Sequence, residues 1–235
     1  MQLKIGLISD IHGNLEALTA ALRSLEKRKV DRLYCLGDVV GYGANPGECL
    51  ELVRAKAEIL LLGNHDAAVA GIEGLEYFNA YAREAAIWTQ KVLNEEQRHF
   101  LAGLPYEDIR GAMHLVHSAP ARPQEWDYLF SAFDAYVHFP YMRGQDCFVG
   151  HSHVPGEYWE GIADGSRKEA ERRIINVGSI GQPRDGDPRL CFVIYDDQSR
   201  ELEFVREEYD IEAAARKIME AGLPRFLAQR LFYGQ

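Results

Sequence analysis

Side chains that bind metals follow apolar runs at five places in the sequence. The clearest is LLLGNHD, residues 60–66, where three leucines and a glycine precede an amide, an imidazole and a carboxylate. The other four places are LISDIHGN, CLGDVVGYG, HLVHSAP and FVGHSHVPG. Aspartate, asparagine and histidine without thiolate favour hard or borderline divalent metals. The candidate ligands are Asp10, His12, Asp38, Asn64, His117, His151 and His153, with His65 and Asp66 beside them.

Each of these features has an ordinary structural explanation when it is taken alone. An Asp-x-His is commonly a capped turn, Gly37-Asp38 is a common turn, and a lone His117 is more often a satisfied core histidine. His151 and His153 are more specific, because imidazoles two residues apart can point into one site. Coincidence at all five places is much harder to accept, so we expect one shared site.

The number and type of ligands indicate two metal ions. Seven candidates exceed the four ligands of a tetrahedral zinc site. Asp38 is the expected bridge, because it lies between the groups in sequence and has two oxygens. Manganese is favoured, with iron, zinc or nickel as alternatives. Two such ions about 3.5–4 Å apart can hold a hydroxide and clamp phosphate oxygens for in-line attack.

The apolar runs also predict the elements that position these residues. Strands are expected at 3–9, 32–36 and 57–62, with a helix at 15–27 capped by Asn14 and another at 46–55. This alternation is typical of a parallel sheet with crossover helices, and ligand sites form beyond the carboxyl ends of such strands.

The rest of the chain is predicted to hold five helices and several strands. The helices are expected at 79–93, 95–102, 131–139 and 211–221, with one more after Pro224. A hairpin is expected at 109–117, and strands at 147–149, 156–161, 174–177, 190–196 and 202–209. Segments 67–81 and 119–126 are expected to be loops that set specificity. Because no linker or repeat interrupts the pattern, we expect one domain over 1–235.

The composition narrows the class of protein. The chain has 235 residues, 47 % of them apolar, and a formal net charge of −10. This charge disfavours extended nucleic acid as a partner but not a small phosphorylated substrate, since bound metal can reverse the local sign. No apolar run approaches the about 18 residues of a membrane span, and Asp10 comes too early for a signal peptide. We expect a cytoplasmic protein whose four cysteines are reduced core residues, in an oligomeric state left open.

Taken in order, the motifs resemble the calcineurin-like metallophosphoesterase family over residues 3–188. Asp-x-His, Gly-Asp, Gly-Asn-His-Asp, His and Gly-His-x-His carry the resemblance. SDIHGN and NVGSIGQPRDGDPR resemble its prokaryotic phosphodiesterase-like branch. The resemblance implies an α/β fold, a four-layer α/β/β/α sandwich of two mixed sheets with a dinuclear site at one sheet edge. It also implies hydrolysis of small or nucleotide-like phosphomonoesters or phosphodiesters by a metal-bridging hydroxide.

The resemblance also implies a role for each residue. His65 would lie beside the site and protonate the leaving oxygen or stabilise the transition state, and Asp66 would orient His65. One departure is His117-Ser118-Ala119-Pro120, where the family often has His-Gly-Ser/Thr-Pro. One metal would take Asp10, His12, Asp38 and His153, and the other would take Asp38, Asn64, His117 and His151.

Several residues have two open interpretations. Arg184 either clamps a phosphate or pairs with Asp185 or Asp187 at the surface. Trp126 and Tyr128 either stack on a base or pack within the fold. Further candidates are Tyr42 near the pocket, Asn14 as a substrate contact or a plain helix cap, and Asn176 and Ser179 as supports of the ligands.

The main competing function is a non-catalytic metal-binding scaffold or protein-interaction subunit of the same fold. Such a protein would be expected to lose His65 or a metal ligand, and this chain keeps all of them. A nuclease acting on DNA or RNA is a third possibility, which the acidic charge and the lack of a basic stripe disfavour.

Overall fold

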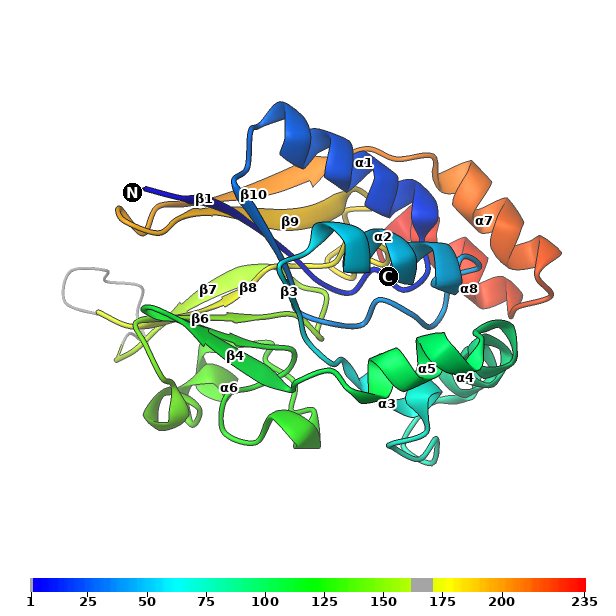
Figure 1. Ribbon diagram of the computed structural model, residues 1–235, viewed down its shortest axis with the longest axis horizontal. Coiled ribbons are helices and arrows are strands. Elements are labelled where there is room, and N and C mark those ends of the chain that lie inside the picture. The colour runs from blue at the N-terminus through cyan, green and yellow to red at the C-terminus, as the bar shows by residue number, and fades with distance from the viewer. Residues whose placement is uncertain (1, 162–170) are drawn as a thin grey trace.

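The computed structural model describes residues 2–161 and 171–235. These residues form two mixed sheets that lie one over the other (Figure 1). Sheet A has the strand order β10-β9-β1-β2-β3, and sheet B has the order β4-β5-β6-β8-β7. The strands of sheet A are β1 (Lys4–Ile8), β2 (Arg32–Cys35), β3 (Ile59–Leu60), β9 (Leu190–Asp196) and β10 (Leu202–Glu207). Those of sheet B are β4 (Glu107–Arg110), β5 (Met113–Val116), β6 (Asp146–Val149), β7 (Gly156–Trp159) and β8 (Arg173–Asn176).

The predicted alternation of strands and helices at the start of the chain is confirmed. Strands β1, β2 and β3 are parallel, and they are joined by α1 (Leu15–Lys27) and α2 (Pro46–Lys56). The side chain of Asn14 caps α1 by accepting a hydrogen bond from Ala17 N at 3.1 Å. Pro46 occupies the first turn of α2, where its missing N–H costs nothing.

Three apolar layers hold the sandwich together. Between the sheets, side chains such as Leu7, Tyr34 and Phe148 are fully buried. Burial of each such side chain contributes about 1.5–3 kcal/mol. A second core lies between sheet A and helices α1 and α2, and a third lies under sheet B against the short α6 (Ala132–Tyr136). The α/β/β/α layering is therefore confirmed, with a thin outer layer on sheet B (Figure 1).

The remaining helices gather at one end of the sandwich, opposite the N-terminus (Figure 1). A buried cluster around Tyr42 joins α4, α7 and α8 there. The helices are α3 (Asn64–Ala70), α4 (Ala80–Val92), α5 (Glu95–Ala102), α7 (Ile211–Glu220) and α8 (Arg225–Arg230), and α8 leads into the 3₁₀ turn Leu231–Tyr233. Among the described residues, none of the helices combines the length and the apolar character that crossing a bilayer requires.

Helix α3 differs from the prediction, which placed a loop from residue 67. Only seven residues long, α3 has too few turns to show an apolar periodicity in the sequence. Its start is stabilised by the Asp66 carboxylate, which accepts a hydrogen bond from Gly63 N at 3.2 Å. The strand before it is also shorter than the predicted 57–62. The Asn-His-Asp motif is therefore the first turn of a helix and not a loop.

Candidate metal centre

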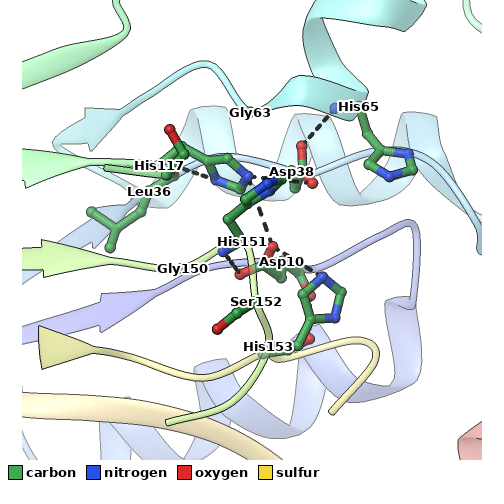
Figure 2. Close-up of polar contacts among 12 residues, drawn as sticks. Asp10, Leu36, Asp38, Gly63, His65, His117, Gly150, His151, Ser152 and His153 are labelled. Carbon is green, nitrogen blue, oxygen red and sulfur yellow. Dashed lines mark hydrogen bonds and ion pairs between the residues drawn. The ribbon is translucent and has the colours of Figure 1, made fainter. Parts of the chain in front are cut away.

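Ligand-bearing turns follow five strands at one edge of the two sheets. Strands β1, β2 and β3 are mutually parallel, as are β5 and β6, so their carboxyl ends meet there. Asn64 begins α3, and the backbone N–H of the next residue, His65, donates to Asp38 Oδ1 at 2.8 Å. Figure 2 shows the side chains pointing toward one another from these turns. The structure brings together the other predicted ligands: Asp10, His12, Asp38, His117, His151 and His153.

Asp38 lies between two groups of ligands. Its Oδ2 is 3.6 Å from His12 Nε2 and 3.5 Å from His117 Nε2. Asp10 Oδ1 is 3.3 Å from His153 Nε2. Three sets of atoms are close enough to hold an ion, namely Asp10 with His12 and His153, Asp38 with His117 and His151, and His12 with Asp38 and His65.

Main-chain carbonyls fix which nitrogen each imidazole presents. The Nδ1 atoms of His12, His117 and His153 lie 3.1, 3.0 and 2.5 Å from the carbonyl oxygens of Val40, Leu36 and Gln182. An Nδ1–H that donates there leaves Nε2 as a lone pair directed at the centre. His151 is reversed, because its Nε2 lies 2.9 Å from the Trp126 carbonyl and leaves Nδ1 free. All four rings are thus oriented as metal ligands.

Three buried atoms of the predicted ligands have no hydrogen-bond partner among the described residues. They are Asp10 Oδ1, Asn64 Oδ1 and His117 Nε2. Leaving such atoms unpaired in an interior costs free energy, so native structures rarely do so. Because a carboxylate, an amide oxygen and an imidazole are all acceptors of hard or borderline cations, the donor set fits divalent metal.

The charge states of the cluster suit metal binding. Burial raises the pKa of Asp10, but His153 and His117 together lower it below its usual range, and the pKa of Asp38 is lowered by His117 and His65. Burial lowers the pKa of His151 to about 3. The exception is His117, whose pKa burial lowers but contact with Asp38 raises to about 9. A metal ion in the site would displace this proton.

The turns that carry the ligands are strained. Asp10, His12, Asp38, His151 and His153 all have positive φ, between 51° and 65°. Each non-glycine residue in this left-handed region costs about 1–3 kcal/mol, and such residues cluster at functional sites. The conformation turns each side chain back over the end of its strand.

Two residues at and just after the end of β8 support the ligands, as the sequence predicted. Ser179 Oγ donates to the carbonyl oxygen of Asp10 at 2.8 Å. Asn176 Nδ2 donates to the carbonyl oxygen of Gly150 at 2.6 Å, immediately before His151. These bonds fix the main chain on both sides of the centre, so the ligands need little rearrangement to bind.

Comparison with known proteins agrees with this geometry. Residues 3–200 match the family model described as the calcineurin-like phosphoesterase superfamily domain. The chain belongs to this superfamily. It is 43 % identical to an uncharacterized protein of Methanocaldococcus jannaschii, over 98 % of each chain. A crystal structure of a metallophosphoesterase from Sphaerobacter thermophilus has 39 % identity and a TM-score of 0.88 over 100 % of both chains. A hypothetical protein from Pyrococcus horikoshii shares the fold, with 21 % identity and a TM-score of 0.85 over 99 % of this chain and 98 % of that chain.

Membership of this superfamily supports a hydrolase that acts on phosphoester bonds.

The departure from the family motif at Ser118 and Ala119 does not displace the preceding ligand, because His117 Nδ1 is bound to the Leu36 carbonyl oxygen. Ser118 Oγ instead donates to the Pro123 carbonyl at 3.0 Å and closes the following turn. The serine therefore stabilises the turn from within.

The predicted contact between Asp66 and His65 is wrong. The Asp66 carboxylate accepts hydrogen bonds from the backbone N–H groups of Val39, Val40 and Gly63 at 3.3, 3.1 and 3.2 Å. Adjacent residues on a helix do not face each other, which is why the two side chains diverge. Asp66 thus fixes the loop that carries Asp38, and burial together with the charge of Asp38 raises its pKa to about 7.

The His65 ring lies at the edge of the cluster and has an unpaired nitrogen. Its centroid is 4.8 Å from that of His12 and 4.4 Å from that of Tyr42. Among the described residues, its buried Nδ1 has no hydrogen-bond partner. Burial lowers the pKa of His65 to about 4, so the ring is neutral at pH 7. A neutral imidazole in this place can donate an N–H to a bound substrate.

The three residues predicted to contact the substrate take different positions in the structure, one as a helix cap and two beside the metal centre. Asn14 Oδ1 caps α1, and its Nδ2 donates to the Gly181 carbonyl at 2.9 Å, so both polar atoms serve the fold. Tyr42 is buried beside His12, with ring centroids 4.7 Å apart. Arg184 Nη2 donates to the Tyr42 hydroxyl at 3.4 Å. Of the two interpretations of Asn14, the helix cap is therefore confirmed, while Tyr42 and Arg184 lie beside the centre.

The aromatic residues near His151 take two roles. Trp126 contributes its carbonyl oxygen to His151, a contact that no side-chain pattern could reveal. The Tyr128 ring stacks on His151 with centroids 4.0 Å apart and an interplanar angle of 21°. Tyr128 is 48 % exposed, so its outer face is open to solvent beside the centre. It remains a candidate for stacking on an aryl or base group.

Proposed function

We propose that this phosphoesterase hydrolyses small phosphomonoesters or phosphodiesters, nucleotides included, at a centre of two divalent ions, with manganese favoured. The unpaired buried atoms of Asp10, Asn64 and His117 carry the proposal, because a bound divalent cation would satisfy all three. Only two of the ligands, Asp10 and Asp38, are carboxylates. Two divalent ions would leave the centre positive, as an anionic substrate requires.

The ligand sets proposed from the sequence are supported by two of the three groups of close ligand atoms. Asp10, His12 and His153 face one position, His117 and His151 face the other, and Asp38 faces both. The assignment of Asn64 to the second position is supported by its unpaired amide oxygen and by the bond that the next residue, His65, donates from its backbone N–H to Asp38. When bound, the ions would supply a hydroxide nucleophile and a Lewis-acid clamp on the phosphate oxygens.

His65 is proposed to stabilise the leaving oxygen. Its ring is neutral at pH 7 because burial lowers its pKa, and it borders the ligand His12. A hydrogen bond from its N–H to the leaving oxygen strengthens as negative charge develops there. Asp66 acts at a distance from the chemistry, by holding the loop of Asp38.

A small substrate and a cytoplasmic location are proposed from the charge of the chain and from its cysteines, respectively. The net charge of −10 disfavours extended nucleic acid, while Arg184 offers a cation for a small phosphate. All four cysteines are free and buried, which fits a reducing compartment such as the cytoplasm. The burial of each thiol raises its pKa and keeps it unreactive.

The test is metal-dependent hydrolysis of bis-p-nitrophenyl phosphate beside p-nitrophenyl phosphate. Protein freed of metal with a chelator would receive manganese, nickel, zinc, iron or magnesium in separate assays. Activity restored by metal supports the proposal, and the ratio of the two rates distinguishes a diesterase from a monoesterase. Stoichiometric uptake of metal without hydrolysis of either compound would favour the non-catalytic scaffold instead.

A further inference from the structure

A groove beside the metal centre is built from the segment that joins β5 to β6. Its volume is about 600 Å³, and six of the residues that line it are polar or aromatic: Arg122, Asp127, Tyr128, Asp134, His138 and Tyr141. Tyr128 connects the groove to the centre, because its ring stacks on the predicted ligand His151 with centroids 4.0 Å apart. A group that packs against Tyr128 in the groove is therefore one ring away from a ligand of the proposed second ion.

Two tyrosines give the groove aromatic walls. The Tyr128 side chain is 48 % exposed and that of Tyr141 is 57 % exposed, so both offer ring surface to a bound group. The Tyr128 ring is held in its orientation by neighbours, since it stacks on His151 and lies parallel to Phe130, with centroids 5.3 Å apart and an interplanar angle of 8°. A ring that is already fixed loses little conformational entropy when a planar group packs against it.

The groove also contains a buried polar group without a partner. His138 is only 5 % exposed, and its Nδ1 has no hydrogen-bond partner among the described residues. Burial lowers the pKa of His138, so the ring is neutral at pH 7 and can accept a hydrogen bond. Asp127 and Asp134 add carboxylate oxygens to the lining. These acceptors match the amino groups that adenine and cytosine carry.

The charges of the groove disfavour an anionic occupant. Among the described residues that line it, Arg122 is the only cation, and its Nη1 already pairs with Glu125 at 2.6 Å. The two aspartates leave the lining with an excess of negative charge. A phosphate would be repelled there, whereas an uncharged planar group would not.

A cation for the phosphate lies outside the groove, at Arg184. Its buried Nε has no hydrogen-bond partner among the described residues. Asp185 pairs with Arg206, and Asp187 pairs with Arg189. The alternative interpretation of Arg184, a surface pair with one of these aspartates, is therefore wrong. Phosphate and planar group thus have separate places, on either side of which the metal centre and the groove differ in charge.

We propose that this groove binds the base of a nucleotide whose phosphate lies at the metal centre. The natural substrate would then be a nucleotide, and not a sugar phosphate or another ester that lacks an aromatic ring. Stacking on an aromatic side chain supplies affinity for any base, and the acceptors favour a base with an amino group. This inference rests on the proposed function and specifies its substrate class.

The test compares two phosphates that differ only by the base. AMP and ribose 5-phosphate would compete with bis-p-nitrophenyl phosphate for the metal-loaded protein. We expect AMP to inhibit the natural protein at about tenfold lower concentration, as one stacked base implies. In Tyr128→Leu this ratio should fall to about two, because the aromatic face is lost while apolar bulk is kept. Tyr141→Leu should also lower the ratio, and it leaves the ring on His151 in place.

Tyr136→Leu is the matched control. Tyr136 is an exposed tyrosine of α6 that does not line the groove, so this variant should keep the natural ratio. The ratio also cancels any loss of phosphate affinity that Tyr128→Leu causes by loosening His151, since both compounds carry the same phosphate. Thermal unfolding of each variant would show whether it is folded.

The outcomes separate this inference from the proposed function. If the natural protein hydrolyses the diester but both groove variants keep the tenfold ratio, the base does not bind in the groove and the hydrolase stands. If no metal supports hydrolysis, calorimetric titration of the metal-loaded protein with AMP and ribose 5-phosphate gives the same comparison. Equal affinities of the natural protein for the two compounds, or binding of neither, would overturn the inference by either method.

Discussion

At the scale of single residues, each ligand depends on a neighbour that selects the atom it presents. Three imidazoles present Nε2 because a carbonyl occupies Nδ1, and His151 presents the opposite nitrogen because the Trp126 carbonyl lies on its other side. Asp38 divides its oxygens, one facing the histidines and one accepting the backbone N–H of His65. A substitution at any of these positions should therefore change metal content in a residue-specific way.

Metal content should distinguish the bridging ligand from a ligand of one ion. We expect about two ions per chain in the natural protein, about one in Asn64→Ala and none in Asp38→Ala, because Asp38 Oδ2 lies within 3.6 Å of a histidine from each group. Elemental analysis after gel filtration measures the stoichiometry. Equal loss in the two variants would contradict the assignment of Asp38 as the bridge.

His65 should affect turnover and leave metal content intact. His65→Ala removes the proposed hydrogen bond to the leaving oxygen, and we expect kcat to fall by roughly 10²–10⁴-fold. His65→Gln restores a neutral N–H donor and should recover part of the loss. Steady-state kinetics with the diester, beside elemental analysis, provide the measurement. If His65→Ala lost metal as Asp38→Ala does, His65 would be a ligand, as its proximity to His12 and Asp38 permits.

At the scale of elements, the turn between β3 and α3 has no room for a side chain. Gly63 is in an extended conformation, with φ −95° and ψ 168°, so any residue could adopt its backbone. A Cβ at this position would overlap Asp38 Oδ1 and Cγ. The glycine of the Gly-Asn-His-Asp motif is therefore required by the ligand beside it and not by the turn.

Gly63→Ala should move Asp38 and lower metal affinity. We also expect a loss of about 1–3 kcal/mol in unfolding free energy from overpacking. Gly71→Ala, at the other end of α3, is the control: its φ of +79° makes alanine unfavourable, but no atom lies within 4 Å of the added Cβ. That variant should lose stability and keep its metal. Calorimetric titration with manganese and urea unfolding separate the two effects.

At the scale of the whole molecule, a buried ionic cluster joins the two sheets at the end away from the metal centre. Asp146, at the start of β6, accepts hydrogen bonds from Arg173 Nε at 2.7 Å and from Tyr195 Oη at 2.6 Å. Arg200, from the turn between β9 and β10, donates to it twice at 2.8 Å. The carboxylate therefore connects sheet B to the last hairpin of sheet A.

Asp146→Asn should destabilise the protein by about 3–5 kcal/mol at pH 7, because it leaves Arg200 without a carboxylate partner among the described residues and leaves the buried Arg173 with Glu157 alone. Burial raises the pKa of Asp146, but Arg200, Tyr195 and Arg173 lower it below its usual value of about 3.9. The ionised carboxylate thus stabilises the fold above about pH 4, and this contribution is lost as the pH falls through the lowered pKa. Urea unfolding at pH 7 and below pH 4 should show the gap between natural protein and variant shrinking. An unchanged gap would contradict this account.

The sequence by itself determined the candidate ligands, the strands that end beside them and the parallel start of sheet A. These follow from local information, because an apolar run that ends in Asp, Asn or His specifies both a strand and what lies at its end. The predicted bounds of α5, 95–102, also agree with the structure, since Asn94 and Gln97 form a recognisable capping box. The four-layer fold, by contrast, was anticipated only through the family resemblance that these motifs carry.

Only the tertiary structure decided the contacts between residues far apart in the sequence. It showed that Asp66 holds the Asp38 loop and not His65, and that a carbonyl from Trp126 reverses the ring of His151. It also brought the C-terminal turn against the loop after β8, where Gly186 N donates to the Gly234 carbonyl at 3.0 Å. Every residue type has a backbone carbonyl, so the sequence cannot show which carbonyl accepts a hydrogen bond. The packing of one segment against another that is distant in the sequence depends on the whole fold, so it could not be predicted from the sequence either.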